Sequence, residues 1–481
     1  MAPLYDPKDR SPEPPLKRFD IMSSLRSTFG QNRNARALLR RGETFSDLGY
    51  LGEALADLDA ALALEPGFVE ALLRRSEVHA DLGHYAQALA DVNLALNLQP
   101  GDAEILARRG EIHRRTGRYR QAIADLDAAL RIDPLDAWAA ASRGETYREM
   151  GLYDLALADL TMAVRIDPND TWAIVSRGQV YEEQERYAEA IADYDEALGQ
   201  SPDDAWALQR RAEAYAAQGR FDDALTDLGR VLGTSPDDVR ALFQRAEIQV
   251  QLGRHGEALA DLDHALQVAP DDSWALVGRA RALALLGRPD EALADLDRAL
   301  IVDPGDGWAV GMRAEINLAR GDYRSALADL NRGLGMYPED AWLLMLRGEV
   351  HRRLGHLSRA LADLSACLQR EPTQARAYAQ RGRTWSDLGS HELAVSDYDR
   401  ALELEPDSAW VLANRGASYL ALGQRDKSLR DLERALDLDE TSALLAGDEI
   451  GIARLLSTVD PSLASRYARV GEAGAASGAG G

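Results

Sequence analysis

Proline recurs along this chain at a fixed interval of 34 residues, with no insertion or deletion between one occurrence and the next. An exact period of this length indicates a repeat architecture in which each repeat is one supersecondary element. The period constrains the fold more tightly than the length of 481 residues, which alone favours about three domains. The repeating prolines are Pro66, Pro100, Pro134, Pro168, Pro202, Pro236, Pro270, Pro304, Pro338, Pro372 and Pro406, and Glu440 takes the next place in register.

Each repeat predicts two helices joined by a tight turn. In the repeat 137–170, apolar and small residues have helical spacing over the first fourteen residues, until Gly151 interrupts them. Glycine takes this place in eleven of twelve repeats, with Glu185 as the exception, and it favours a helix C-terminus because it accepts a positive φ without strain. The second helix is predicted to end near Ile166, ahead of Pro168. The twelve repeats begin at residues 35, 69, 103, 137, 171, 205, 239, 273, 307, 341, 375 and 409.

Small residues recur where the predicted helices must touch. Position 8 of the repeat is always Gly, Ala or Ser, and Ala stands early in the second helix from Ala54 to Ala394 before Ser428 breaks the row. A large side chain at either place would push neighbouring helices apart. Aspartates such as Asp136 stand just ahead of the next repeat, where they can cap its first helix.

The combination of small residue, Gly, Tyr, Ala and Pro on this period resembles the tetratricopeptide repeat family, over about residues 35–442. The resemblance implies an all-α fold, an α-solenoid of antiparallel helix pairs forming a right-handed superhelix. The first helix of each pair would line a concave groove. One hairpin cannot bury its own apolar face, so stacking of neighbours is expected on physical grounds as well.

The segments outside the repeats have a different composition. Residues 1–34 are expected to form a disordered, proline-rich arm with a short cap helix from residue 21, and residues 35–442 the twelve repeats. Residues 443–470 are expected to supply a C-terminal capping helix or helices, with a helix around 441–458, and residues 471–481 a flexible tail.

Composition excludes several classes of function. A net charge of −24 disfavours nucleic acid as a partner, because the chain repels phosphate. The single cysteine, Cys367, allows no internal disulfide and is interpreted as a buried small residue. The sequence shows no secretory signal and no run of about 18 apolar residues, so a soluble cytoplasmic protein is expected. The abundance of Ala, Gly, Asp and Arg is typical of a bacterial, GC-rich gene.

An Arg–Asp ladder runs through every repeat. Position 7 is always Arg and position 23 is always Asp, one on each helix of the hairpin. The ladder could contact a ligand, but its identical use in terminal and central repeats favours a clamp between the two helices. The pairs are Arg41 and Asp57, Arg75 and Asp91, Arg109 and Asp125, Arg143 and Asp159, Arg177 and Asp193, Arg211 and Asp227, Arg245 and Asp261, Arg279 and Asp295, Arg313 and Asp329, Arg347 and Asp363, Arg381 and Asp397, and Arg415 and Asp431.

Position 2 holds seven of the eight tryptophans, and the resemblance places this position on the concave side. An exposed aromatic cluster marks a binding site, so the row is a candidate for partner contact, unless each ring packs on the preceding repeat as a spacer. Both interpretations stay open. The candidate partner-binding residues of the row are Trp138, Trp172, Trp206, Arg240, Trp274, Trp308, Trp342, Arg376 and Trp410.

Position 9 is mostly acidic and lies about two turns further along the same helix face. Carboxylates beside aromatic rings favour a partner that carries Arg or Lys. The alternatives are a solvated acidic face, or carboxylates that pair with nearby arginines such as Arg114, Arg148 and Arg352. The candidate binding residues are Glu111, Glu145, Glu213, Glu247, Glu315 and Glu349.

No enzyme signature is found in the sequence. The histidines are scattered, and His79, His113 and His351 take a position that elsewhere holds Tyr, so they are interpreted as packing residues. There is no metal-ligand spacing and no phosphate-binding glycine loop, so no catalytic residue, metal or cofactor is expected. The Lys/Asn carboxylate clamp and the asparagine ladder of specialised family members are also missing.

The sequence therefore predicts a protein–protein interaction scaffold that binds a partner protein or peptide, with basic residues, along a Trp/Glu-lined groove. The strongest contacts are expected between Trp138 and Trp342. The alternatives are a solenoid that self-associates as a dimer or filament and, with less support, a module that stacks its tryptophans on sugar rings.

Overall fold

The computed structural model describes residues 34–438, and within this range it is built of helices and contains no strand. Every repeat supplies two antiparallel helices, so the all-α solenoid of helix pairs expected from the sequence is confirmed. The predicted terminal caps and tail lie outside the described residues. In chain order the helices are α2 (Ala35–Asp47), α3 (Leu51–Leu64), α4 (Val69–Asp81), α5 (Tyr85–Leu98), α6 (Ala103–Arg115), α7 (Tyr119–Ile132), α8 (Ala137–Glu149), α9 (Tyr153–Ile166), α10 (Thr171–Glu183), α11 (Tyr187–Gln200), α12 (Ala205–Ala217), α13 (Phe221–Thr234), α14 (Val239–Gln251), α15 (His255–Val268), α16 (Ser273–Leu285), α17 (Pro289–Val302), α18 (Gly307–Ala319), α19 (Tyr323–Met336), α20 (Ala341–Arg353), α21 (Leu357–Arg370), α22 (Ala375–Asp387), α23 (His391–Leu404), α24 (Ala409–Ala421) and α25 (Arg425–Leu438).

The helix ends follow the predicted signals. Asp136 caps α8, because its Oδ1 accepts the amide hydrogen of Ala139 at 2.9 Å. Gly151 ends the same helix with a φ of +72°, and Glu185 adopts a φ of +59° at the equivalent place after α10. Glu185 is therefore held in the left-handed region, which an L-residue with a side chain adopts at a cost of about 1–2 kcal/mol.

The small residues at position 8 are required by the packing of the two helices of a hairpin. A Cβ added at Gly144 would lie 2.8 Å from Cγ of Leu160, and one added at Gly178 would lie 2.5 Å from Cε1 of Tyr194. Real Cβ contacts are not that short, so a larger residue would force the hairpin open. Cys367 is fully buried in the second helix of its hairpin, as predicted.

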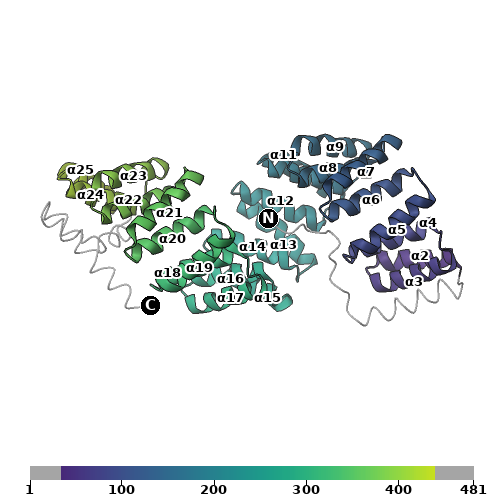
Figure 1. The fold of residues 1–481 in the computed structure, drawn as a ribbon, viewed down its shortest axis with the longest axis horizontal. Helices are drawn as coiled ribbons and strands as arrows, with labels where there is room; N and C mark the ends of the chain where they lie inside the picture. Colours follow the sequence, from purple (N-terminus) through teal and green to yellow (C-terminus); the bar gives the residue numbers. More distant parts are fainter. Residues whose placement is uncertain (1–33, 439–481) are drawn as a thin grey trace. The chain divides into compact units, whose positions relative to one another are not determined.

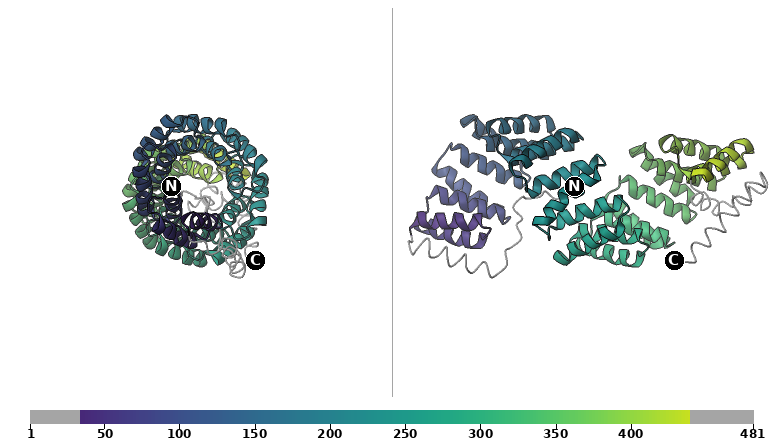
Figure 2. Two further views of the ribbon diagram at one scale, coloured as in Figure 1. Left: turned by 90° about the vertical axis from the view of Figure 1, so that its right-hand side faces the viewer. Right: turned by 180° about the vertical axis from the view of Figure 1, so that it is seen from behind.

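Within the described residues the hairpins form two compact blocks, the N-terminal block of residues 34–244 and the C-terminal block of residues 245–438. Within each block, consecutive hairpins stack so that first helices lie beside first helices (Figure 1). Figure 2 shows the same succession of hairpins from two further sides. Each block therefore presents a face made by its first helices, called here the first-helix face, on which positions 2, 9, 12 and 13 of the repeat lie.

Candidate functional site

The Arg–Asp ladder is an internal clamp. In each of the twelve repeats, Nε and Nη2 of the position 7 arginine donate to the two carboxylate oxygens of the position 23 aspartate. In the repeat 137–170 these distances are 2.6 Å and 2.8 Å between Arg143 and Asp159. The aspartate is buried by this pairing and the guanidinium is partly buried, so the prediction of a structural clamp is confirmed.

In most repeats the same arginine also ties its hairpin to the one before it. The remaining nitrogen, Nη1, of Arg143 donates to Asp127 of the preceding second helix at 2.6 Å, and Arg279 donates to Asp263 in the same way at 2.8 Å. Sequence analysis overlooked this contact, although the signal is there: a polar side chain often stands two residues after the clamp aspartate. Further examples are Arg75 with Asp59, Arg109 with Asn93, Arg313 with Asp297, Arg347 with Asn331 and Arg415 with Asp399.

The candidate glutamates of the N-terminal block, Glu111, Glu145 and Glu213, are paired within the chain. Glu111 accepts two hydrogen bonds from Arg114, at 2.9 Å and 2.6 Å, and Glu145 is held by Arg148 in the same manner. Glu213 contacts Arg210 of its own helix, and it also accepts from Arg240 at 3.0 Å. The expected alternative, in which arginines of the chain neutralise these carboxylates, describes this block.

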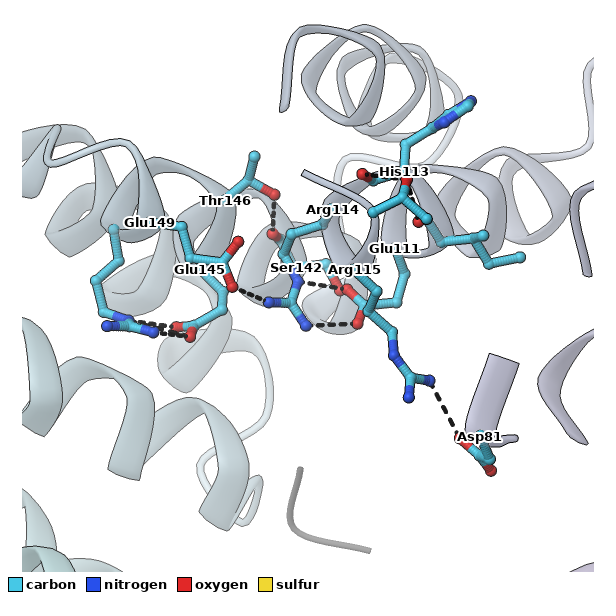
Figure 3. Close-up of polar contacts among 12 residues, drawn as sticks. Asp81, Glu111, His113, Arg114, Arg115, Ser142, Glu145, Thr146 and Glu149 are labelled. Carbon is cyan, nitrogen blue, oxygen red and sulfur yellow. Dashed lines mark hydrogen bonds and ion pairs between the residues drawn. The ribbon is translucent and has the colours of Figure 1, made fainter. Parts of the chain in front are cut away.

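The same arginines reach the next hairpin and so join neighbouring first helices. Arg114 on α6 contacts Glu149 on α8, and Arg148 on α8 contacts Glu183 on α10 (Figure 3 shows the first of these). Arg115 reaches the other way, to Asp81 on α4, at 3.1 Å. The side chain of Glu149 is only 4% exposed, and burial raises its pKa to about 6 although Arg114 opposes the shift. We call the paired charged residues of these first helices the ionic face of the N-terminal block. They are Asp81, Glu111, Arg114, Arg115, Glu145, Arg148, Glu149 and Glu183.

A small pocket of about 230 Å³ lies on the ionic face between α10 and α12. Glu182, one of its lining residues, accepts a hydrogen bond from the hydroxyl of Tyr194 at 2.8 Å and lies 3.8 Å from Arg210. Burial raises the pKa of Glu182 to about 7, against the attraction of Arg210. Arg210 also donates to the amide oxygen of Gln179 when that oxygen faces the guanidinium, at 2.8 Å and 3.0 Å. Sequence analysis missed this cluster, whose signal is a Tyr at a position that holds Leu or Val in every other repeat except one, where it is Tyr398.

The position 9 glutamates of the C-terminal block are paired as well, but their partners come from different directions. Glu247 accepts from Arg281 of α16 at 2.8 Å, and Glu315 accepts from Arg376 of α22 at 3.1 Å. Glu349 is buried between Arg352 and Arg353. Burial opposes ionisation of Glu349, but these two arginines outweigh it and lower its pKa.

The tryptophans of position 2 differ in exposure. Trp274 and Trp308 are 51% and 49% exposed and Trp138 is 38% exposed, whereas the others are half-buried. The half-buried members of the row are Trp172, Trp206, Trp342 and Trp410, together with Arg240, while Arg376 is exposed. The two most exposed rings therefore lie in consecutive repeats of the C-terminal block.

Trp342 shows why a tryptophan of this row can be a spacer. Its ring stacks on that of Trp308, with centroids 4.9 Å apart and planes inclined by 30°. It also lies over Gly311 of the preceding first helix, where an added Cβ would fall 2.1 Å from its Cζ3. Trp342 thus packs on the preceding repeat, while Trp308, beneath it in the stack, keeps half of its surface open.

The first helices that carry these rings have apolar side chains at positions where α6, α8 and α10 have charged ones. Positions 12 and 13 are Ala284 and Leu285 on α16, and Leu318 and Ala319 on α18. Leu285 is 52% exposed. Leu285 follows Trp274 by eleven residues, and Ala319 follows Trp308 by eleven, so each pair lies on one side of its helix. Trp274, Leu285, Trp308, Leu318 and Ala319 form a surface that we call the α18 face.

Among the described residues, no group of three or more His, Cys, Asp or Glu side chains could hold a metal ion. His113 and His351 are packed beside the clamp aspartates of their hairpins, 3.8 Å and 4.0 Å away, and burial lowers the pKa of both. No helix in this part of the chain is long and apolar enough to cross a membrane.

Models of the tetratricopeptide repeat match most of the chain between residues 39 and 442. Their matches cover residues 39–103, 108–171 and 312–374, residues 178–219 and 386–423, and residues 211–277, 249–316 and 411–442. The chain belongs to the tetratricopeptide repeat family. The resemblance found in the sequence is thereby confirmed. No curated protein matches the chain significantly.

Several solved structures are similar to this chain at low sequence identity. A tetratricopeptide repeat protein from Parabacteroides merdae is 20% identical, with a TM-score of 0.43, and the match covers 52% of this chain and 98% of that one. Cut9 in the APC/C hetero-tetramer Cut9–Hcn1 is 14% identical, with a TM-score of 0.49 and coverage of 93% and 98%. Yeast Tom70 is 17% identical, with a TM-score of 0.42 and coverage of 90% and 98%.

Proposed function

We propose that this tetratricopeptide repeat protein is a protein-interaction scaffold, and that it holds a segment of a partner protein on the α18 face. The observation that carries the proposal is the pair of half-exposed tryptophans in consecutive repeats, Trp274 and Trp308, with Trp308 stacked on Trp342. Large exposed rings that cluster on a rigid surface are the usual centres of binding energy in protein interfaces.

The proposal assigns recognition to the rings rather than to the glutamates. All six candidate glutamates already contact arginines of this chain, so a basic side chain of a partner would have to displace one. Such an exchange gains little, because one ion pair replaces another. The sequence alone predicts the strongest partner contacts between Trp138 and Trp342. The proposal narrows this region to its C-terminal part, from Trp274 to Trp342.

The double change Trp274→Ala and Trp308→Ala tests the proposal. Affinity capture from the native cell identifies a partner, and its affinity for wild type and variant is then measured with purified proteins. Loss of two central aromatic anchors is expected to weaken binding at least about 30-fold, equivalent to about 2 kcal/mol.

The matched control is Trp172→Ala with Trp206→Ala, which removes two rings from the same repeat position in the N-terminal block. The control is expected to bind within about threefold of wild type. Unchanged binding by the Trp274/Trp308 variant, with its helical circular dichroism intact, would refute the proposal.

A second copy of the chain is the alternative occupant of the same face, because two exposed apolar surfaces can cover each other. Sedimentation at low and high protein concentration separates the two. A Trp308-dependent dimer would favour self-association, and a monomer at all concentrations would leave the partner protein as the occupant.

A further inference from the structure

The α18 face is bounded by ion pairs that lead away from it. Arg281 and Glu315 hold the same repeat position on the neighbouring helices α16 and α18, with charges of opposite sign. They do not pair with each other: Arg281 contacts Glu247 of α14, and Glu315 contacts Arg376 of α22. Arg281 is thus directed toward α14 and Glu315 toward α22. The side chains of the α18 face between them are apolar.

Neighbouring first helices elsewhere are joined by charged or amide side chains. In the N-terminal block Arg108 contacts Glu77 across α6 and α4, at 3.5 Å. In the C-terminal block Arg352 contacts Asp387 across α20 and α22, at 2.9 Å. The contact that joins α18 to α20 is instead the stack of Trp308 on Trp342. The α18 face differs from the rest of the first-helix surface by offering rings and aliphatic groups in place of polar partners.

This chemistry discriminates between an extended and a helical ligand. An extended segment exposes backbone N–H and C=O groups, and burying them without a partner costs about 1–3 kcal/mol each. The polar side chains nearest the face, Arg281 and Glu315, are already engaged at 2.8 Å and 3.1 Å. A helix satisfies its own backbone hydrogen bonds, so it can cover the face without this cost.

The dimensions fit a helix of a few turns. Trp274 and Leu285 are eleven residues apart on one side of α16, which corresponds to about 16 Å. The adjacent helix α18 adds a second row at a typical interaxial distance of about 10 Å. A ligand helix with apolar residues at i, i+3 or i+4, and i+7 presents a stripe about 10 Å long over two turns, enough to contact both rows.

We infer that the segment bound on the α18 face is an amphipathic helix that presents large apolar side chains and needs no charged residue at the contact. This inference rests on the proposed function and adds the conformation and chemistry of the ligand.

Selection from a random library of 16-residue peptides displayed on phage tests the inference. The full chain is the target, and the Trp274→Ala, Trp308→Ala variant is used for counter-selection. Peptides that bind only the wild type are expected to show apolar residues with helical spacing and to gain helical circular dichroism on binding. Their dissociation constants are expected to change less than about threefold between 0.1 M and 1 M NaCl, because no exposed ion pair forms.

A second pair of variants guards against misfolding. Leu285→Glu places a charge on the α18 face, where the native side chain is half exposed, and is expected to weaken the selected peptides at least tenfold. Leu286→Glu changes the next residue, which is 41% exposed at the end of α16, and is expected to leave binding unaltered.

The outcomes separate the inference from the function on which it rests. Tryptophan-dependent peptides that are proline-rich, or that carry a fixed Lys or Arg and lose binding in 1 M NaCl, would overturn the helical ligand and leave the α18 face as the site. An absence of peptides that depend on the tryptophans would overturn both.

Discussion

The ionic face of α6, α8 and α10 and the α18 face occupy the same positions of the same repeat, yet they have opposite chemistry. In the first, Arg148 and Glu145 are largely buried and paired within α8, and Arg148 also pairs with Glu183 on the neighbouring helix α10. In the second, Trp274 and Leu285 are half exposed. Both regions have the same Arg–Asp clamp inside each hairpin. The packing of the two helices within a hairpin therefore does not depend on the first-helix face. This face can hold neighbouring hairpins together in one region and bind a partner in another.

The largest expected effect comes from breaking the ionic face. Arg148→Met leaves Glu145 buried without its partner, and removal of one member of a buried pair costs about 3–5 kcal/mol. Urea unfolding, combined with amide hydrogen exchange in α8 and α10, would locate the loss, because repeat proteins respond through nearest neighbours.

Arg281→Met is the matched control in the C-terminal block. Its pair with Glu247 is more exposed, with side chains 34% and 29% accessible, so we expect a loss below about 1 kcal/mol. Equal losses from the two variants would show that the ionic face contributes no more to cohesion than the charges beside the α18 face.

A smaller effect is expected from a methyl group inserted under the tryptophan stack. Gly311→Ala places a Cβ against the ring of Trp342, which must shift, at a cost of about 1–3 kcal/mol. Tryptophan fluorescence and the thermal midpoint would report the change. Gly335→Ala on α19 meets no atom within 4 Å and should be neutral or slightly stabilising. A Gly311 variant that behaves like the Gly335 variant would mean that the stack is loosely packed.

The stability of the N-terminal block should depend on pH through Glu182. Because the folded-state pKa of Glu182 is raised to about 7 from an ordinary value near 4.5, its contribution is present below about pH 4.5 and is lost as the pH rises through 7. Glu182→Gln should remove this slope, which we expect to be on the order of 1–2 kcal/mol. The difference in unfolding free energy between wild type and variant, measured from pH 4.5 to 8, isolates it from the histidines. A difference that does not vary with pH would contradict the raised pKa.

The smallest effect concerns the turn after α10. Glu185→Gly relieves the left-handed backbone but makes the unfolded chain more flexible, so a net gain of about 0.5 kcal/mol is expected. The reciprocal change, Gly151→Glu after α8, should cost about 1 kcal/mol, since its φ is +72°. Thermal melting of the two variants checks the sign of each change in stability. A stabilising effect of Gly151→Glu would contradict the argument.

The fold could be read from the sequence because its determinants are local and repeated. Pro168 and Gly151 set the helix ends, and the small residue at Gly144 sets the approach of α8 to α9. The Arg143–Asp159 clamp was also predictable, since both residues recur in every repeat at a spacing that joins the two helices.

The candidate site could be predicted only in part, because exposure depends on side chains from other repeats. The row of tryptophans was evident, but the burial of Trp342 is decided by Gly311 and Trp308, one repeat earlier. Whether Glu315 is free or paired depends on Arg376, 61 residues further along the chain. Such contacts are pairings between particular residues rather than properties of the period.

The clamp has a consequence for how the chain can be made. Arg279 pairs with Asp263 and with Asp295, and each partner is only 16 residues away in sequence. Contacts of such short range belong to a low contact order, which favours rapid folding. During synthesis from the N-terminus, the preceding hairpin is already folded when the two helices of a new hairpin have emerged. The new hairpin can therefore pack on it at once. The chain can then fold during translation, one hairpin at a time, with little apolar surface exposed to solvent.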